Sequence, residues 1–251
     1  MPLPKLTKKQ HIHLPTPLGL MLITLIFLTT TIFILKNLAN YLAEQQPLNK
    51  GILVVEGWLS EQALLTAVEQ YQSNPYQQLI TTGGLIKGRQ NTAYKTYAES
   101  AATFLQNNGI NKNNITALVT PESAQNRTFL SAVIVRDWLI NKKHRTTEID
   151  VFSGAVHARR TRDLYQMAFP DQYKIGIIAA KPREYTLKQW WQSSAGAKTV
   201  ITEFVGLIWV KCCFYQGEYQ SHQERWGGSG CLRMLDHPVA LNIFQICIRT
   251  L

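Results

Sequence analysis

Charged residues and cysteines are both scarce in this sequence, and each scarcity excludes a class of protein. Only 17% of the 251 residues are Asp, Glu, Lys or Arg, whereas 45% are hydrophobic. A chain with this much apolar surface to bury is globular, not disordered or collagen-like. All four cysteines lie beyond residue 211. The first 211 residues therefore contain neither a disulfide scaffold nor a cysteine-based zinc module.

The charge that is present is positive but dispersed. The net charge is +10, from 26 Lys and Arg against 16 Asp and Glu, yet no block of five or six like charges occurs. This distribution argues against a nucleic-acid partner. The six histidines offer no pair at metal-ligand spacing on one helix, so we expect no metal site. The sequence does not indicate which cofactor, if any, is bound.

A long uncharged segment near the N-terminus is the strongest physical signal. Residues 10–35 contain no Lys, Arg, Asp or Glu, and residues 18–35 are apolar except for one Gly and four Thr. This length approaches the roughly 20 residues that a helix needs to cross a bilayer. We predict a transmembrane anchor over residues 18–36. A buried core helix is disfavoured because it would keep a polar stripe, and a signal peptide because no Ala-x-Ala cleavage site follows.

The anchor divides the chain into segments with different expected places. Lysines are denser before the apolar segment than after it, at Lys5, Lys8 and Lys9 against Lys36 and Lys50. The positive-inside rule then places residues 1–17 in the cytoplasm and the main domain outside it. We expect residues 37–50 to be a polar linker and residues 51–214 one domain. Residues 215–251 form a tail of unknown role, in which Cys231 and Cys247 are free to pair outside the cytoplasm.

Short β-branched runs alternate with helical patterns from residue 51 onward. Strands are predicted at residues 52–55, 78–82, 115–119, 149–153 and 174–179, and helices at residues 60–71, 91–107, 126–140 and 157–167. Ser60 is the expected N-cap of the first of these helices. Helical connections of this length imply parallel strands with right-handed crossovers. The predicted fold class is α/β, a Rossmann-like three-layer α/β/α sandwich with a mostly parallel sheet.

Polar residues follow the predicted strands at their carboxyl ends, where an open parallel sheet binds its ligand. His157 and Arg160 stand three residues apart at the start of a helix and so share a face. Arginine can hold a phosphate or carboxylate by two hydrogen bonds, and histidine can transfer a proton near neutral pH. We predict this pair as the catalytic residues. Their neighbours Arg159 and Arg162 are predicted to form a solvated helical face.

Further residues complete the predicted ligand site. They are Glu56, Gly83, Gly84, Ser123, Arg127, Thr128, Ser153 and Glu203. Five of them also have a purely structural interpretation. The glycines suit a tight turn with positive φ, Ser123 a helix cap, and Glu56 an ordinary surface position. Glu203 stands in an apolar helix, where an ion pair with a nearby arginine is favoured over direct catalysis.

The order and spacing of these motifs resemble the SanA/ElyC/YdcF family of bacterial cell-envelope proteins over about residues 51–214. The resemblance rests on Gly83-Gly84, on Ser123, Arg127 and Thr128 in PESAQNRT, on His157 and Arg160, on Trp190-Trp191 and on Glu203. It includes an N-terminal anchor and implies a role in envelope or peptidoglycan maintenance. The chain departs from the family at Tyr97, where a Glu is frequent, and at Ser131, where an Asn is frequent.

Two classes of function follow from these residues. In the first, the domain binds an anionic or phosphate-bearing small molecule, such as a nucleotide or a lipid-linked precursor, and acts as a phosphoryl-centre transferase or hydrolase. His157 would be the general acid–base, and Arg160 and Arg127 would stabilise negative charge. In the second, the same site binds the ligand in a non-catalytic or regulatory protein. The sequence shows no nucleophile with a paired base.

Overall fold

The computed structural model describes residues 16–86, 95–122 and 126–214 of the chain. Ser123, the two tail cysteines Cys231 and Cys247, and most of the basic N-terminal segment lie outside these residues. The chain divides into two units, Met1–Leu38 and Ala39–Leu251.

Helix α1 (Pro17–Leu42) contributes its apolar part to the first unit. Among the described residues it is the one helix long and apolar enough to span a membrane, with a mean hydropathy of 2.5 over 18 residues. Two of its threonines return their hydroxyls to the helix: Thr24 Oγ1 donates to the Leu20 carbonyl and Thr29 Oγ1 to the Leu25 carbonyl, both at 2.9 Å. These polar groups are thereby satisfied within the helix, as a lipid environment requires.

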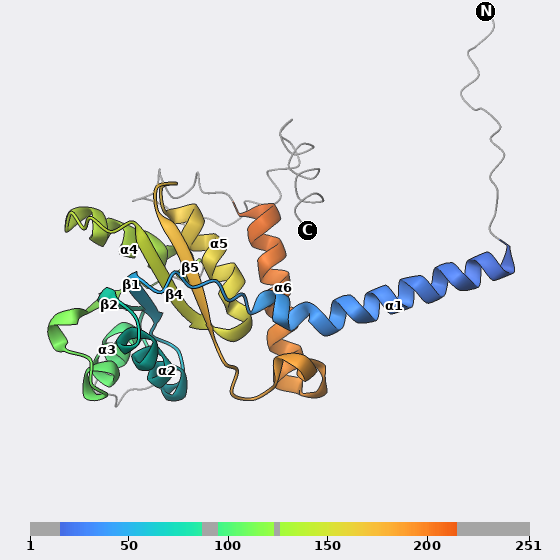
Figure 1. The fold of residues 1–251 in the computed structure, drawn as a ribbon, viewed down its shortest axis with the longest axis horizontal. Helices are drawn as coiled ribbons and strands as arrows, with labels where there is room; N and C mark the ends of the chain where they lie inside the picture. The colour runs from blue at the N-terminus through green and yellow to red at the C-terminus, as the bar shows by residue number, and fades with distance from the viewer. Residues whose placement is uncertain (1–15, 87–94, 123–125, 215–251) are drawn as a thin grey trace, which may run out of the picture. The chain divides into compact units, whose positions relative to one another are not determined.

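The second unit is built on a five-stranded sheet in which every pairing is parallel (Figure 1). Its spatial order is β3-β2-β1-β4-β5. The strands are β1 (Gly51–Glu56), β2 (Tyr76–Gly83), β3 (Ile115–Val119), β4 (Glu148–Gly154) and β5 (Lys174–Ala180). All five predicted strands are present, and the predicted α/β, Rossmann-like fold is confirmed.

Helices cover both faces of the sheet, and β1 shows how the sequence divides between them. Leu53 and Val55 belong to one buried cluster with α2 (Glu61–Gln72) and α3 (Tyr97–Asn107). Ile52 and Val54 belong to a second cluster on the other face. That cluster is completed by α4 (Arg127–Asn141), α5 (Ala158–Ala168) and the end of α6 (Ser194–Cys213). Adjacent residues of a strand point to opposite faces, so a strand between two helical layers is apolar throughout.

Side-chain caps explain where two of the helices begin. Ser60 caps α2 by accepting a hydrogen bond from the Ala63 amide at 3.4 Å, as the sequence predicts. Helix α3, expected from residue 91, begins at Tyr97. Thr96 is extended and caps it, accepting from the Glu99 amide at 3.2 Å and donating to the Glu99 carboxylate at 2.8 Å. Because of this reciprocal cap the helix begins after Thr96, so the longer predicted helix is wrong at residues 95–96.

The segment expected to be a linker is built into the α/β unit from residue 39 onward. Helix α1 continues to Leu42, whose side chain is fully buried. Gln46 then pairs with Ile177 of β5 in an antiparallel bridge. The buried Asp150 accepts hydrogen bonds from the backbone amides of Leu48 at 2.8 Å and Asn49 at 2.7 Å. These contacts leave little of residues 37–50 free to act as a tether.

Arg159 and Arg162 of α5 face this segment, so the predicted solvated face is wrong. Arg162 Nη1 lies 2.6 Å from Glu44 Oε1, and Arg159 Nη1 lies 3.6 Å from Glu44 Oε2. Arg159 Nε also donates to the Tyr41 carbonyl at 2.6 Å, and its guanidinium stacks 3.9 Å from the Tyr41 ring centroid. Residues more than a hundred positions away in sequence supply these partners, which helical spacing alone does not reveal.

Candidate functional site

The site lies at the carboxyl ends of β1, the central strand, and of its neighbour β4. From β1 the chain continues outward to β2 on one side of the sheet, and from β4 it continues outward to β5 on the other side. The boundary between β1 and β4 is therefore the topological switch point, where open parallel sheets bind ligands. Ser153 at the end of β4 donates to Glu56 Oε2 at 2.6 Å, and Thr161 Oγ1 donates to Glu56 Oε1 at 3.4 Å. Glu56 is 4% exposed, so its surface interpretation is wrong.

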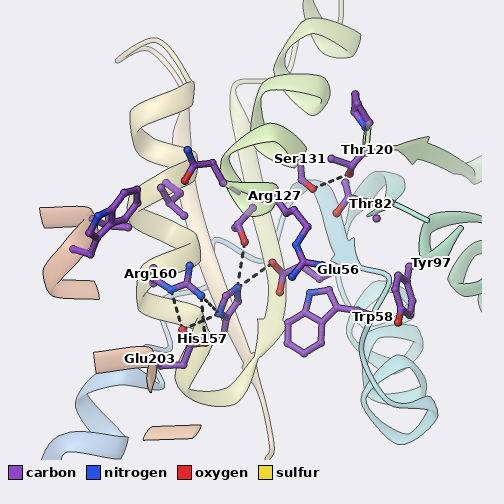
Figure 2. Close-up of a pocket in the computed structure, with 18 residues that line it drawn as sticks. Glu56, Trp58, Thr82, Tyr97, Thr120, Arg127, Ser131, His157, Arg160 and Glu203 are labelled. Carbon is purple, nitrogen blue, oxygen red and sulfur yellow. Dashed lines mark hydrogen bonds and ion pairs between the residues drawn. The ribbon is translucent and has the colours of Figure 1, made fainter. Parts of the chain in front are cut away.

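A pocket of about 540 Å³ opens above these strand ends (Figure 2). Of the predicted site residues that the structure describes, Ser153 does not line the pocket but supports Glu56 from below. The structure brings all the others together in its wall: Glu56, Gly83, Gly84, Arg127, Thr128, His157, Arg160 and Glu203.

His157 is held through one of its ring nitrogens. It ends a short 3₁₀ turn (Ala155–His157) between β4 and α5, and its Nδ1 lies 2.9 Å from both Glu203 Oε2 and Arg160 Nη2. A guanidinium only donates and an ionised carboxylate only accepts, so a proton on Nδ1 bonded to Glu203 satisfies the most groups. In this tautomer the neutral ring keeps the lone pair of Nε2 available.

The other ring nitrogen faces the pocket. His157 Nε2 lies 3.4 Å from Thr128 Oγ1 and 3.7 Å from Glu56 Oε1. The Trp58 ring packs edge-on against the imidazole, with 5.5 Å between the ring centroids. Nε2 is therefore placed between a hydroxyl and a buried carboxylate, where it can accept or deliver a proton.

Glu203 and Arg160 form the ion pair predicted for the apolar helix. Arg160 Nε donates to Glu203 Oε2 at 2.9 Å and Nη2 donates to Oε1 at 3.2 Å. Burial by itself would raise the pKa of Glu203, but the hydrogen bonds and charges of His157 and Arg160 outweigh it and lower the pKa to about 2. The charge of Arg160 is thus compensated, and Arg160 positions Glu203 and His157 instead of standing free for an anion.

Arg127 is the pocket cation that remains available. It is the first residue of α4, and within the described part of the chain no hydrogen bond or ion pair joins its guanidinium to another side chain. Figure 2 shows it extending from α4 into the pocket. The preceding Asn126 has φ 53° and its side chain does not cap the helix. The amides of the first turn of α4 and their partial positive charge therefore add to the charge of Arg127.

Gly83 and Gly84, at the carboxyl end of β2, hydrogen-bond to the residue after β3 and to the first residue of α3. The Gly83 carbonyl accepts from the Thr120 amide at 3.2 Å, and the Gly84 carbonyl accepts from the Tyr97 amide at 2.9 Å. A Cβ on Gly83, where φ is +156°, would lie 2.7 Å from Tyr97 Cβ. The positive φ agrees with the structural interpretation of this glycine, and the close approach of α3 is a second constraint that the sequence does not show.

Several pocket residues are not among the predicted site residues. They include Trp58, Thr82, Tyr97, Thr120, Ser131, Leu164, Trp209 and Val210. Tyr97 and Ser131 are the two positions at which the chain departs from the SanA/ElyC/YdcF pattern, and both line the pocket. The departure from the family pattern is the one feature of the sequence that points to Tyr97 and Ser131. Trp190 and Trp191, which contribute to the resemblance, do not line the pocket.

The described residues contain no cluster of three or more His, Cys, Asp or Glu side chains arranged to hold a metal ion. Comparisons with protein-family models, curated proteins and solved structures gave no match. The pocket wall itself combines the guanidinium of Arg127 with the imidazole of His157.

Proposed function

We propose that this protein is a membrane-anchored envelope protein of the SanA/ElyC/YdcF type that binds a phosphate-bearing small molecule in the pocket and acts at its phosphoryl centre. The observation that carries the proposal is the setting of His157. Glu203 holds its Nδ1, Arg160 in turn holds Glu203, and its Nε2 faces a cavity into which Arg127 also extends. A base oriented by a carboxylate, beside an available cation, suits acid–base chemistry on an anion.

The pocket residues divide the reaction among them. Arg127 and the first amides of α4 hold the phosphoryl oxygens and stabilise the negative charge that develops on them. His157 Nε2 takes a proton from water, or from an acceptor hydroxyl, as its oxygen bonds to phosphorus and the bond to the leaving oxygen breaks. The imidazolium then returns that proton to the leaving oxygen. Glu203, ionised because of its low pKa, stabilises the imidazolium between these events.

The placement of the protein is part of the proposal. Helix α1 is long and apolar enough to span a membrane, and the lysines before it favour an N-terminus in the cytoplasm. The α/β unit then lies outside the cytoplasm, where envelope precursors are used. A reporter that is active only outside the cytoplasm, fused after residue 214, should be active. Activity from a cytoplasmic reporter alone would reverse the orientation.

Binding is tested on the full-length protein in a fixed concentration of non-ionic detergent, with butyl phosphate as the probe. Arg127→Gln should weaken binding about tenfold or more, since a charge-assisted hydrogen bond is worth about 1.5–3 kcal/mol. The matched control is Arg145→Gln, at an exposed arginine beyond the far end of α4. Unchanged affinity in Arg127→Gln, or an equal loss in both variants, would place the anion elsewhere.

Turnover separates an enzyme from a non-catalytic binding protein. His157→Gln keeps the size and hydrogen bonding of the side chain but cannot titrate near neutral pH. It should slow release of inorganic phosphate from butyl phosphate by a factor of about 10² to 10⁴ while butyl phosphate still binds. Binding by the wild-type protein without any phosphate release would support the regulatory alternative for this substrate class.

A further inference from the structure

One end of the pocket is apolar, and Arg160 marks where it begins. On α5, Leu164 lies one turn beyond Arg160. On α6, Gly206 lies against Arg160, since a Cβ there would be 3.2 Å from Arg160 Nε. Trp209 and Val210 follow Gly206 by one turn. Leu164, Trp209 and Val210 all line the pocket, so its wall changes from charged to hydrocarbon beside Arg160.

The apolar surface continues out of the pocket along α6. Trp209 lines the pocket yet is 43% exposed, and Val205 and Ile201 precede it at intervals of four residues with 59% and 53% exposure. Residues at this spacing form one stripe on a helix. The opposite face of α6, which includes Val200, Leu207 and Val210, is buried. The stripe of Ile201, Val205 and Trp209 is therefore exposed hydrocarbon that reaches the pocket at Trp209.

The chain leaves little slack between this unit and the expected membrane span. The apolar run ends at Leu35 and the α/β unit begins at Ala39, so only three residues intervene. Three residues cover at most about 11 Å even when fully extended. The proposed anchor would thus tether the unit to a membrane by a short segment, which makes membrane amphiphiles the ligand class to consider.

We infer that the ligand is a lipid phosphate, whose head group occupies the charged end of the pocket and whose hydrocarbon chain leaves past Trp209 along the α6 stripe. This inference rests on the proposed function, because Arg127 and His157 supply the head-group site. It adds what the charged residues do not determine, which is the nature of the group attached to the phosphate. A nucleotide of the same charge would leave Ile201 and Val205 in water, whereas a hydrocarbon chain covers them and gains the free energy of apolar burial.

The first test compares probes that share a head group. Butyl, octyl and dodecyl phosphate are titrated into the full-length protein at one detergent concentration, with dodecanol and adenosine monophosphate as comparison probes. Each buried methylene strengthens binding about fourfold, so dodecyl phosphate should bind at least tenfold more tightly than butyl phosphate. Equal affinity for all three phosphates, or tighter binding of adenosine monophosphate, would overturn the inference and leave the proposed phosphate site standing. Failure of every phosphate to bind would overturn both.

The second test asks whether the hydrocarbon chain of the probe lies along α6. Partition of the probes into detergent is the same for every variant, so it does not affect the comparison. Ile201→Ser combined with Val205→Ser should remove most of the advantage of dodecyl over butyl phosphate and leave the affinity for butyl phosphate unchanged. The control combines Ile140→Ser with Leu65→Ser, at exposed apolar positions of 52% and 43% on other helices. It should keep the advantage. Equal behaviour of the two double variants would show that the chain does not follow α6.

The same variants test other occupants of the stripe. If a second copy of the protein covers the stripe, the wild type will be a dimer and the α6 double variant will be a monomer. If residues 215–251 cover it, that variant will melt at a clearly lower temperature than the control double variant. Either result would overturn the assignment of the stripe to a lipid chain. The inference requires that both double variants keep the oligomeric state and the melting temperature of the wild type.

Discussion

The two faces of α5 carry similar charges but have different surroundings. On one face, Arg159 and Arg162 hold Glu44, whose side chain is 7% exposed. On the other, His157 at the N-cap of the helix and Arg160 hold Glu203, which is 16% exposed. In both places one carboxylate balances two basic side chains.

The difference lies in what fills the space next to each carboxylate. On the Glu44 side, Arg159 also contacts Tyr41 and Arg162 also donates to the Ile175 carbonyl of β5, so both arginines have further protein partners. The Glu203 side borders a cavity, and His157 presents Nε2 to it. The same ionic chemistry therefore attaches a segment on one face and orients the imidazole of His157 on the other.

The largest effect is expected where the carboxylate orients a reactive group. Glu203→Gln removes the charge that stabilises protonated His157 and permits the wrong tautomer. Phosphate release from butyl phosphate should fall about a thousandfold, or roughly 4 kcal/mol. Glu44→Gln, measured in the same assay, should keep wild-type turnover. Equal losses in the two variants would mean that the faces do not differ in function.

Acid should remove the contribution of ionised Glu203 to stability. The folded-state pKa of Glu203 is about 2, against 4.5 for a free glutamate, so its contribution to stability is fully present above pH 4.5 and is lost as the pH falls towards 2. That contribution is on the order of 3 kcal/mol. Between pH 5 and pH 2.5 the melting temperature should fall further in the wild type than in Glu203→Gln. Glu61→Gln, at an exposed carboxylate, should follow the wild type.

The closed face should matter for stability alone. Glu44→Gln leaves two arginines facing a neutral amide, and the free energy of unfolding should fall by about 2 kcal/mol, discounted for the partial exposure of both arginines. Chemical denaturation of the full-length protein measures this. Lys50→Gln breaks an exposed ion pair with Glu148 and should cost less than about 1 kcal/mol. A reversed order would contradict the structural role of Glu44.

The smallest effect is expected from Arg159, because Arg162 remains bound to Glu44 when Arg159 is replaced. Arg159→Gln loses the stacking on Tyr41 and one hydrogen bond to its carbonyl, which together should cost about 1 kcal/mol of stability with no change in turnover. Arg160→Gln, one position away, should lower turnover because Glu203, which orients His157, loses the partner that positions it. Similar turnover in Arg159→Gln and Arg160→Gln would show that the two faces of α5 do not differ in function.

Much of the fold follows from local patterns in the sequence. The β-branched runs predict all five strands, and Ser60 predicts the start of α2, because side-chain alternation and helix caps depend on residues close in the chain. The start of α3 is missed because Thr96 and Glu99 form a reciprocal cap inside a helical pattern. Arg159 and Arg162 are misjudged because their partners, Tyr41 and Glu44, lie in a segment that looks like a polar linker.

The candidate site follows the same division. The sequence by itself determined a parallel α/β sheet, a helix able to span a membrane, and a set of polar residues at strand ends, since strand direction places all carboxyl ends on one edge. Only the tertiary structure decided which of these residues act together. Glu203 lies 46 residues from His157 in sequence, and folding brings it 2.9 Å from Nδ1. That contact frees Nε2 for the pocket and leaves Arg127, not Arg160, as the available cation, because the charge of a side chain is local information but its partner is not.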